Sequence, residues 1–287
     1  MSAPRIITVG SVNLDLVAAC ETLPRPGETV TGATFAQYPG GKGANQALAA
    51  RRLGADVSML ARVGKDPNAE LALALLRKDG VDLSRIVEDE AAQTGVALIG
   101  VDASGENFII VASGANAELD ARDVEGAGPA DAVLCQLEVP ISAVIAASQI
   151  ASKLFALNLA PAMPVPAGLL ETADLLIVNE VEADFYGDAL FRGDGLVAKT
   201  LGRDGSVLYR AGKEVAHMPV YAVPVVDTTG AGDTFCGALA VALAEGMEEG
   251  AALRFASGAA ALAVTKEGAQ PSLPWRSEVE AFLADKA

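Results

Sequence analysis

The segment Val226–Phe235, which reads VDTTGAGDTF, combines a glycine-rich turn with a carboxylate. Where such a turn opens a helix, it presents unpaired backbone N–H groups and the positive end of the helix dipole. We therefore predict that Gly230, Ala231 and Gly232 form an anion hole for a transferring phosphoryl group. Asp233, which follows them, is placed to accept the proton of an attacking hydroxyl group. A carboxylate that only caps the helix electrostatically is the alternative that this segment alone leaves open.

A second glycine-rich segment, Gly40–Asn45, reads GGKGAN and matches neither common phosphate-binding fingerprint. A Walker A loop requires Ser or Thr after the lysine, where Gly43 stands, and a dinucleotide fingerprint requires a third glycine, where Gln46 stands. The glycines let the backbone approach a ligand closely, and Lys42 and Asn45 offer hydrogen-bond donors to hydroxyl groups. An ordinary glycine-rich helix start fits the isolated segment equally well.

Polar residues also follow two of the predicted strands. Asn13 and Asp15 come soon after the apolar run Ile6–Gly10. Alternate residues of an extended segment face the same way, so these two side chains are placed to hold neighbouring hydroxyl groups of one sugar. A polar edge strand that discourages aggregation is the alternative. Glu138, after the run Ala132–Leu137, allows the same two interpretations.

Two further segments suit a nucleotide. The turn Thr200–Gly205, which reads TLGRDG, could hold the phosphates or the ribose of a nucleotide, and an ordinary hairpin turn is its alternative. Asn179, with Glu182 three residues later, follows the predicted strand Asp174–Val178 and could order a hydrated Mg²⁺ ion. A capped helix start is the alternative for this pair.

The elements that must position these residues alternate between strand and helix, which predicts an α/β fold. We expect three layers: a doubly wound, mostly parallel sheet with helices on both faces, and ligands beyond the carboxyl ends of the strands. The predicted strands are Ile6–Gly10, Val57–Val63, Ala132–Leu137, Leu154–Asn158 and Asp174–Val178. The predicted helices are Gly43–Leu53, Asn68–Lys78, Ile141–Ser152, Thr234–Leu243, Ala251–Val264 and Glu278–Ala284.

Two pairs of alternating segments interrupt this pattern. The first pair is Val12–Ala19 and Thr29–Tyr38, separated by prolines and a glycine, and the second is Gly95–Val101 and Asn107–Val111. Alternation with such a break predicts antiparallel pairs with one apolar face each. Because each pair needs a partner for that face, we expect all four strands to form one small sheet projecting from the main body.

The net charge and the amino-acid composition limit the kinds of molecule that this protein can bind. The formal charge of −16, from 21 Lys and Arg against 37 Asp and Glu, argues against binding to nucleic acid or an anionic membrane. Cys20, Cys135 and Cys236 are widely spaced, so we interpret them as reduced packing residues of a cytoplasmic protein. The N-terminal residues do not resemble a signal peptide, and no window is apolar for long enough to span a membrane. The single histidine, His217, rules out multi-histidine metal sites and is expected on the surface of a hairpin.

Together and in this order, these segments resemble the motifs of the PfkB-type family of sugar kinases. The resemblance runs from Ile6 to Leu283, and the two double-glycine motifs are highly specific as a pair. The segment between Asn179 and Thr200 departs from the family pattern, because it is shorter than usual by about one helix. The motifs are Gly10–Asp15, Pro26–Thr29, Gly40–Asn45, Gln136–Glu138, Thr200–Gly205, Asp227–Asp233 and Gly268–Ser272.

The resemblance implies three groups of binding residues. Sugar contacts are implied for Asn13, Asp15, Gly41, Lys42, Asn45, Glu138 and Asp233. Contacts with ATP are implied for Asn179, Thr200, Leu201, Gly202, Arg203, Asp204, Gly205, Gly232 and Ser257, with Glu182 beside Asn179. An activating K⁺ ion is implied near Asp227, Thr229, Ala263, Lys266, Gly268 and Ser272, in several cases through backbone carbonyl groups.

The resemblance also implies a single α/β domain over residues 1–287, in which two insertions, at about 12–39 and 94–112, form a lid over the sugar. In this family such a lid commonly serves as a homodimer interface, and the Asn-x-Asp pattern favours ribose. The predicted reaction is phosphoryl transfer from MgATP to the 5-hydroxyl group of D-ribose. Fructose, nucleosides and deoxy sugars are alternative acceptors within the family, and a non-catalytic sugar-binding regulator is the alternative outside it.

Overall fold

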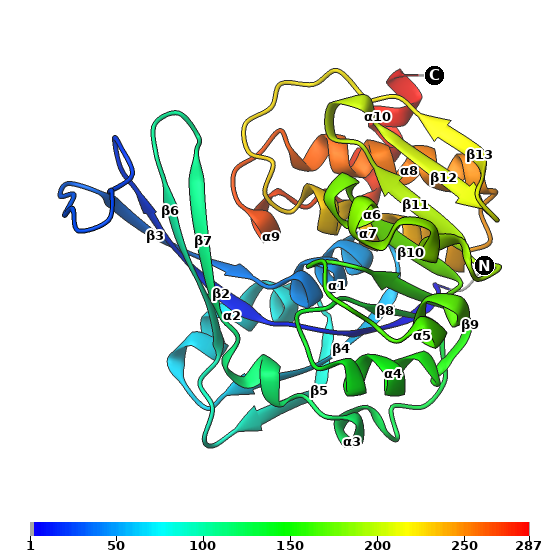
Figure 1. Ribbon diagram of the computed structural model, residues 1–287, viewed down its shortest axis with the longest axis horizontal. Coiled ribbons are helices and arrows are strands. Elements are labelled where there is room, and N and C mark those ends of the chain that lie inside the picture. Colours follow the sequence, from blue (N-terminus) through cyan, green and yellow to red (C-terminus); the bar gives the residue numbers. More distant parts are fainter. Residues whose placement is uncertain (1–2, 287) are drawn as a thin grey trace.

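The computed structural model describes residues 3–286, and within them the strands form two sheets (Figure 1). The larger sheet has nine described strands in the order β13-β12-β11-β10-β9-β8-β1-β4-β5. Neighbouring strands from β5 to β11 run parallel, and β12 and β13 complete the sheet as antiparallel strands. They span β1 (Arg5–Val9), β4 (Asp56–Gly64), β5 (Asp82–Asp89), β8 (Ala130–Cys135), β9 (Ala151–Asn158), β10 (Leu175–Val178), β11 (Leu196–Thr200), β12 (Ser206–Arg210) and β13 (Lys213–Met218).

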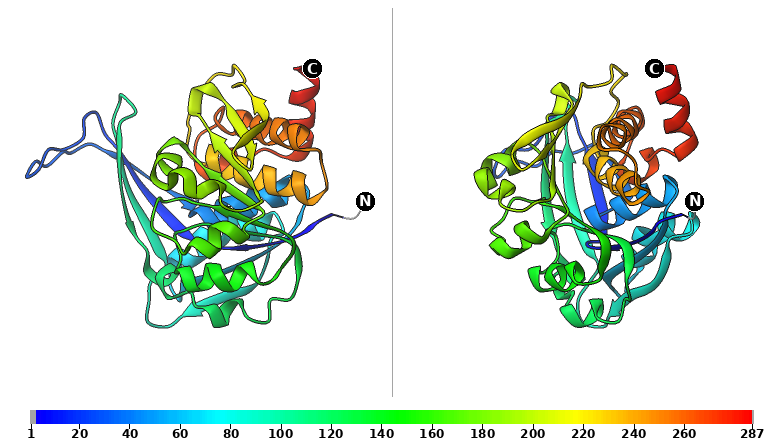
Figure 2. Two further views of the ribbon diagram at one scale, coloured as in Figure 1. Left: turned by 45° about the vertical axis from the view of Figure 1, so that its right-hand side comes forward. Right: turned by 90° about the vertical axis from the view of Figure 1, so that its right-hand side faces the viewer.

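Helices cover both faces of this sheet, because alternate strand residues point to opposite sides (Figure 2). Ile6 packs into one apolar cluster and Ile7 into the other. The first cluster contains residues of α1 (Lys42–Arg52), α2 (Pro67–Lys78), α7 (Ala231–Ala244), α8 (Glu249–Ala263) and α10 (Arg276–Asp285). The second contains residues of α3 (Ala121–Val124), α4 (Ile141–Ser148), α5 (Ala167–Thr172) and α6 (Glu180–Tyr186). The predicted three-layer α/β architecture is therefore confirmed.

The remaining strands form the small sheet, in the order β3-β2-β6-β7, which projects from the left of the body in Figure 1. Strands β2 and β3 are antiparallel, as are β6 and β7, and β2 pairs with β6 in parallel. The prediction that both hairpins join in one sheet is confirmed. The strands are β2 (Asn13–Ala19), β3 (Thr34–Gly40), β6 (Gly95–Val101) and β7 (Asn107–Ala112).

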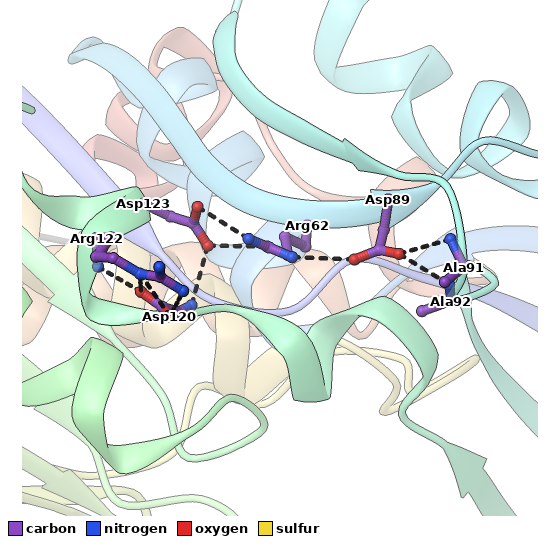
Figure 3. Close-up of polar contacts among 7 residues, drawn as sticks. All are labelled: Arg62, Asp89, Ala91, Ala92, Asp120, Arg122 and Asp123. Atoms are coloured by element: carbon purple, nitrogen blue, oxygen red, sulfur yellow. Dashed lines mark hydrogen bonds and ion pairs between the residues drawn. The ribbon is translucent and has the colours of Figure 1, made fainter.

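Ion pairs fix the segment that leads from the large sheet into β6 (Figure 3). Arg62 of β4 donates to Asp89 at the end of β5, across 2.9 Å, and to Asp123 of α3, across 2.8 Å. The other oxygen of Asp89 accepts the backbone N–H groups of Ala91 and Ala92, each at 2.8 Å. A few residues on, Thr94 donates its backbone N–H group to Asp66 at 2.7 Å. The entry to the small sheet is thus held by hydrogen bonds and ion pairs of half-buried carboxylates.

Most predicted elements agree with the structure, and the differences are shifted ends and an unpredicted edge strand. The helix predicted over Ile141–Ser152 is wrong at its C-terminal end, because the chain turns at Gln149 and Ile150 and begins β9 at Ala151. Strand β3 begins at Thr34 rather than Thr29. Strand β5 was not predicted, since this edge strand carries a mixed, half-exposed sequence.

Three smaller expectations can also be compared with the structure. His217 lies exposed in the β12–β13 hairpin, as predicted. Cys135 and Cys236 are buried free thiols and Cys20 is a half-buried one. Within residues 3–286, no helix combines the length and apolarity needed to cross a membrane.

Candidate active site

The residues predicted to do chemistry meet where the carboxyl ends of the central strands face the N-terminal ends of α1 and α7. A cavity of about 170 Å³ lies there. This is the position at which parallel α/β sheets generally bind ligands. The lining residues are Lys42, Asn158, Ala160, Ile177, Val178, Asn179, Glu182, Thr200, Gly230, Gly232, Asp233 and Cys236.

Asp233 lies in the first turn of α7 and accepts hydrogen bonds on both carboxylate oxygens. Asn45 donates to Oδ2 across 2.8 Å, and Gln46 donates to Oδ1 across 2.9 Å. Burial raises the pKa of Asp233, while the Lys42 ammonium group and the two amide donors oppose that rise. The carboxylate is therefore not an isolated helix cap, because it is bonded to side chains of the other glycine-rich motif.

The turn before Asp233 leaves room for a ligand. Gly230 has φ 78°, in the left-handed region, and a Cβ atom built there would lie 2.9 Å from Cα of Ala269, so this position requires glycine. A Cβ atom at Gly232 would meet nothing within 4 Å. The N–H group of Ala231 donates to the carbonyl oxygen of Thr228 at 3.3 Å, so one of the three predicted anion-hole amides already has an acceptor.

Of the predicted sugar residues, Lys42 and Asp233 line the cavity, and Glu138 and Asn45 are hydrogen-bonded to them. Glu138 accepts hydrogen bonds from Ser11 Oγ at 2.5 Å and from the backbone N–H group of Lys42 at 3.2 Å. Burial and the neighbouring carboxylates of Glu138 and Asp233 raise the pKa of Asp15 to about 7, while Lys42 lowers it. Burial lowers the pKa of Lys42, but the surrounding carboxylates outweigh this effect and raise it overall.

The glycines of the Gly40–Asn45 segment allow this gathering. Gly41 has φ 89°, and a Cβ atom there would lie 2.7 Å from the backbone nitrogen of Asn13. A side chain at Gly40 would collide with the carboxylate of Asp15. The segment therefore lets the start of α1 approach the backbone between β1 and β2 closely. The predicted approach of this backbone to a ligand stays a prediction.

Of the residues predicted to face ATP, Asn179, Glu182, Thr200 and Gly232 line the cavity, and Leu201–Gly205 and Ser257 do not. Asn179 and Glu182 form a reciprocal cap at the start of α6, in which each side chain accepts the other's backbone N–H group at 2.9 Å and 2.8 Å. Glu182 also lines the cavity, and burial raises the pKa of its carboxyl group. The helix-cap alternative is therefore present in the structure, and both carboxylate oxygens of Glu182 accept hydrogen bonds from Asn179. Each oxygen keeps further acceptor capacity.

The turn after β11 continues this end of the site. Thr200 lines the cavity, and Gly202–Asp204 form a single 3-10 turn before β12. Ser257 of α8 is hydrogen-bonded to Ser206 across 2.8 Å, which places α8 beside this turn. The short segment between Asn179 and Thr200 contains α6, one 3-10 turn at Gly187–Phe191 and the strand β11.

The residues associated with K⁺ lie in two loops that are joined by Asp227. Its Oδ1 accepts the N–H and hydroxyl groups of Thr229 at 2.8 Å and 2.6 Å, and its Oδ2 accepts the N–H group of Gly268 at 2.9 Å. Ser272 donates its hydroxyl group to Ala269. The side chain of Lys266 pairs with Glu278 of α10, so only the backbone of Lys266 is available for a cation.

The structure adds four side-chain amides that the sequence did not single out as functional. Gln46, Gln136 and Asn158 form a buried chain that ends on Asp233, and Asn116 bonds to Asn13. One signal was available for Asn158, because it ends β9 just as Glu138 follows β8. The position of Asn116, after β7, becomes relevant only when β7 returns beside β2.

An α/β fold of this topology, with a carboxylate and a glycine turn at a helix N-terminus above the sheet, is that of a carbohydrate kinase. Residues 3–276 match the family described as pfkB family carbohydrate kinase, and the chain belongs to this family. It is 41% identical to a ribokinase of Bacillus subtilis (strain 168), covering 97% of this chain and 99% of that protein. It is 38% identical to the ribokinase of Haemophilus influenzae, covering 97% and 98%.

Solved structures agree with this assignment. A ribokinase from Thermotoga maritima superposes with a TM-score of 0.89 at 34% identity, covering 98% of this chain and 99% of that one. A ribokinase of Arabidopsis thaliana, solved in complex with ribose and ATP, superposes with a TM-score of 0.87 at 33% identity, covering 99% of each chain. These likenesses extend over the large sheet and the small sheet together.

Proposed function

We propose that this protein is an ATP-dependent kinase that phosphorylates the 5-hydroxyl group of D-ribose, giving ribose 5-phosphate and ADP. One observation carries the proposal: Asp233 sits at the N-terminus of α7, faces the cavity, and is hydrogen-bonded to Asn45 of the sugar side. The base thus lies between the two groups of binding residues. The similarity to ribokinases over nearly the whole chain supports ribose as the acceptor.

In the proposed reaction, Asp233 takes the proton of the 5-hydroxyl group as its oxygen attacks the γ-phosphorus of ATP. The new O–P bond forms while the bond from phosphorus to the β,γ-bridging oxygen breaks, and ADP leaves with that electron pair. The amides at Gly230–Gly232 stabilise the charge on the transferring group. Lys42 and Asn45 orient the sugar, with Asn13, Asp15, Gly41 and Glu138 around its other hydroxyl groups.

The residues that are not assigned to the sugar suit ATP and its Mg²⁺ ion. We assign ATP to Asn179, Thr200–Gly205 and Ser257. Asn179 and Thr200 line the cavity, and Ser257 contacts Ser206, just after this turn, which supports the assignment. The buried carboxylate of Glu182 fits a hydrated Mg²⁺ ion, since hard cations prefer oxygen ligands and keep several waters. When bound, Mg²⁺ neutralises charge on the outer phosphates.

The loops joined by Asp227 fit K⁺ because they offer only oxygen donors. Asp227 has acceptor capacity beyond its three hydrogen bonds, which join the Thr229 turn to the loop at Gly268. We assign the remaining oxygen ligands to carbonyl groups of Thr229, Ala263, Lys266 and Gly268 and to the hydroxyl group of Ser272. Among the described residues, no three His, Cys, Asp or Glu side chains cluster as a transition-metal site would require. A bound K⁺ would hold these loops against the start of α7 and thereby support the anion hole.

We further infer that the small sheet is the lid of a single domain, that the protein is a homodimer through this lid, and that it works in the cytoplasm. Cross-strand pairing puts four exposed apolar side chains on the face opposite Asp15, which we call the outer patch: Phe35, Leu98, Phe108 and Ile110. An exposed apolar group of this kind favours a protein partner. Free thiols suit a reducing compartment.

A coupled ADP-release assay tests the substrate. Ribose, fructose, deoxyribose and adenosine would be offered with MgATP, with KCl and with a tetramethylammonium salt in its place. We expect the highest kcat/KM for ribose and a higher rate in K⁺. A preference for another acceptor would overturn the ribose assignment. If no ADP is released with any of the four acceptors, a sugar-binding regulator would be favoured. Calorimetry with ribose and an ATP analogue would then show whether nucleotide binding has been lost.

A further inference from the structure

Three buried amide side chains form a continuous chain from β8 to Asp233. Gln136 Nε2 donates to Gln46 Oε1 across 2.6 Å. Gln46 Nε2 donates both to Asp233 Oδ1, at 2.9 Å, and to Asn158 Oδ1, at 3.1 Å. Asn158 Nδ2 in turn donates to the carbonyl oxygen of Ile177 at 3.2 Å. Gln46 and Gln136 are fully buried, and Asn158 is 7% exposed.

The direction of donation in this chain is set by the carboxylate. An ionised carboxylate only accepts hydrogen bonds, so Gln46 must turn its NH₂ group toward Asp233. Its carbonyl oxygen then faces Gln136, which must donate in return. Both hydrogens of the Gln46 NH₂ group are used, one by Asp233 and one by Asn158. The amides therefore have one consistent arrangement, and it is the one that presents a donor to an ionised Asp233.

The chain of amides restricts which residues can stand beside it in the core. Gln136 occupies the space beside Gly10 at the end of β1, where any side chain would collide with its amide. Its Oε1 atom is buried without a hydrogen-bond partner in the described part of the chain. A buried polar atom left without a partner is unfavourable, so the bond that Gln136 donates to Gln46 comes with an uncompensated acceptor in the core. A functional requirement explains why an amide stands there.

We propose that Gln46, held in place by Gln136, is the positioning residue of Asp233: it fixes the plane of the carboxylate and favours its ionised form. This inference rests on the proposed role of Asp233 as the base. Asn45 and Gln46 each hold one carboxylate oxygen, but they differ in their other contacts. Asn45 is a proposed sugar contact, so its bond to Asp233 competes with the substrate. Gln46 is bonded to Gln136 and Asn158 and remains in place when the sugar binds.

Several acidic groups lie around Asp233, so a hydrogen-bond donor is needed to favour its ionised form. The titratable groups close to it are Lys42 of α1, Asp15 of β2, Glu138 after β8 and Cys236 of α7, and Glu182 of α6 lines the same cavity. Lys42 is the cation among these groups, and it is shared by several carboxylates. Burial and the like charge of Glu138 raise the pKa of Asp233, and the Gln46 donor lowers it. When this donor is removed, the pKa of Asp233 should rise, and less of the base should be ionised at neutral pH.

The test compares Gln46→Met, which keeps the length of the side chain and removes the donor, with the wild-type protein. We expect kcat at neutral pH to fall by about 10–100-fold, and the acid limb of the kcat profile to move upward by about one to two pH units. The KM for ribose should change little. Gln149→Met, at an exposed amide at the end of α4, is the matched control and should leave both quantities unchanged.

Two further variants separate positioning from damage to the core. Gln136→Met removes the donor to Gln46 alone and should shift the acid limb in the same direction by a smaller amount. In an Asp233→Asn background, Gln46→Met should cause no further loss of kcat, because the group on which it acts is gone. An unmoved acid limb in either single variant, or an equal loss in the Asp233→Asn background, would overturn the inference. Near-normal turnover of Asp233→Asn alone would instead overturn the assignment of the base.

Discussion

Asn116 Nδ2 lies 2.7 Å from Oδ1 of Asn13 and donates a hydrogen bond to it. The same side chain bonds to both backbone polar atoms of Val12, at 2.8 Å and 3.1 Å, and is 1% exposed. The segment that leaves the small sheet after β7 is thereby locked to the segment that enters it before β2. Because Oδ1 of Asn13 already accepts this bond, its Nδ2 group is the one that could donate to the proposed sugar.

Replacing Asn116 by Leu should weaken ribose binding through Asn13. We expect the KM for ribose to rise by about 3–10-fold, the equivalent of one neutral hydrogen bond, with little change in kcat. Unpaired polar atoms of Val12 should also lower the free energy of unfolding by about 1–3 kcal/mol. Ile7→Val, which removes a buried methyl group far from the sugar side, controls for stability loss. A KM that rises equally in this control would contradict the role of Asn116.

Asp15 should make the sugar-free protein less stable as the pH rises. Its pKa is about 7 in the folded protein, against 3.8 as the ordinary value, so the folded state binds the extra proton between these pH values. Stability from this group is thus present at low pH and lost as the pH rises through about 7. Asp15→Asn should therefore raise the free energy of unfolding at about pH 8 by about 0.5–2 kcal/mol.

Urea unfolding at several pH values measures this difference. The gap between Asp15→Asn and the wild type should widen from about pH 4 to about pH 7 and then stay constant. Calorimetry should show that the stabilised variant has lost most of its ribose affinity. A gap that does not depend on pH would show that the Asp15 carboxyl group is not perturbed in the folded protein.

The sequence predicted the parts of this site that depend on local backbone chemistry. Gly230 and Gly41 stand where left-handed φ values and close approaches require glycine, and Asp233 directly follows one of these turns. The strand–helix order likewise predicted the layers, since each apolar run needs cover on both faces. Such features are encoded within a few residues, so they can be recognised before any tertiary contact is known.

The contacts that the sequence did not reveal are those between distant segments. Gln46 and Gln136 are 90 positions apart and Asn116 and Asn13 are 103 apart, and an isolated amide has no pattern that identifies its partner. The end of α4 was also missed, because Gln149 and Ser152 are compatible with a helix until β9 pairs with β8. Tertiary pairing decides both kinds of detail.

The two glycines that flank Ala231 should respond differently to a methyl group. Gly232 has open space around its missing Cβ atom, so Gly232→Ala should fold normally while its methyl group projects toward the proposed phosphoryl position. We expect kcat to fall by about 10²-fold with an unchanged melting temperature. Gly230→Ala is the comparison, because its left-handed backbone and the 2.9 Å approach to Ala269 should cost about 1–2 kcal/mol of stability. Normal turnover in Gly232→Ala would place the transferring phosphate elsewhere.

The outer patch should determine the oligomeric state. Ile110 is 58% exposed and pairs across the strands with Leu98, which is 46% exposed, on the face of the small sheet opposite Asp15. A carboxylate placed in a buried apolar interface is costly, so Ile110→Glu should convert the proposed dimer to a monomer. Light scattering coupled to size-exclusion chromatography measures the mass. Val215→Glu adds the same charge at an exposed valine of β13, away from the small sheet, and should leave the dimer intact. A wild-type monomer, or a dimer that survives Ile110→Glu, would show that the outer patch is not the interface.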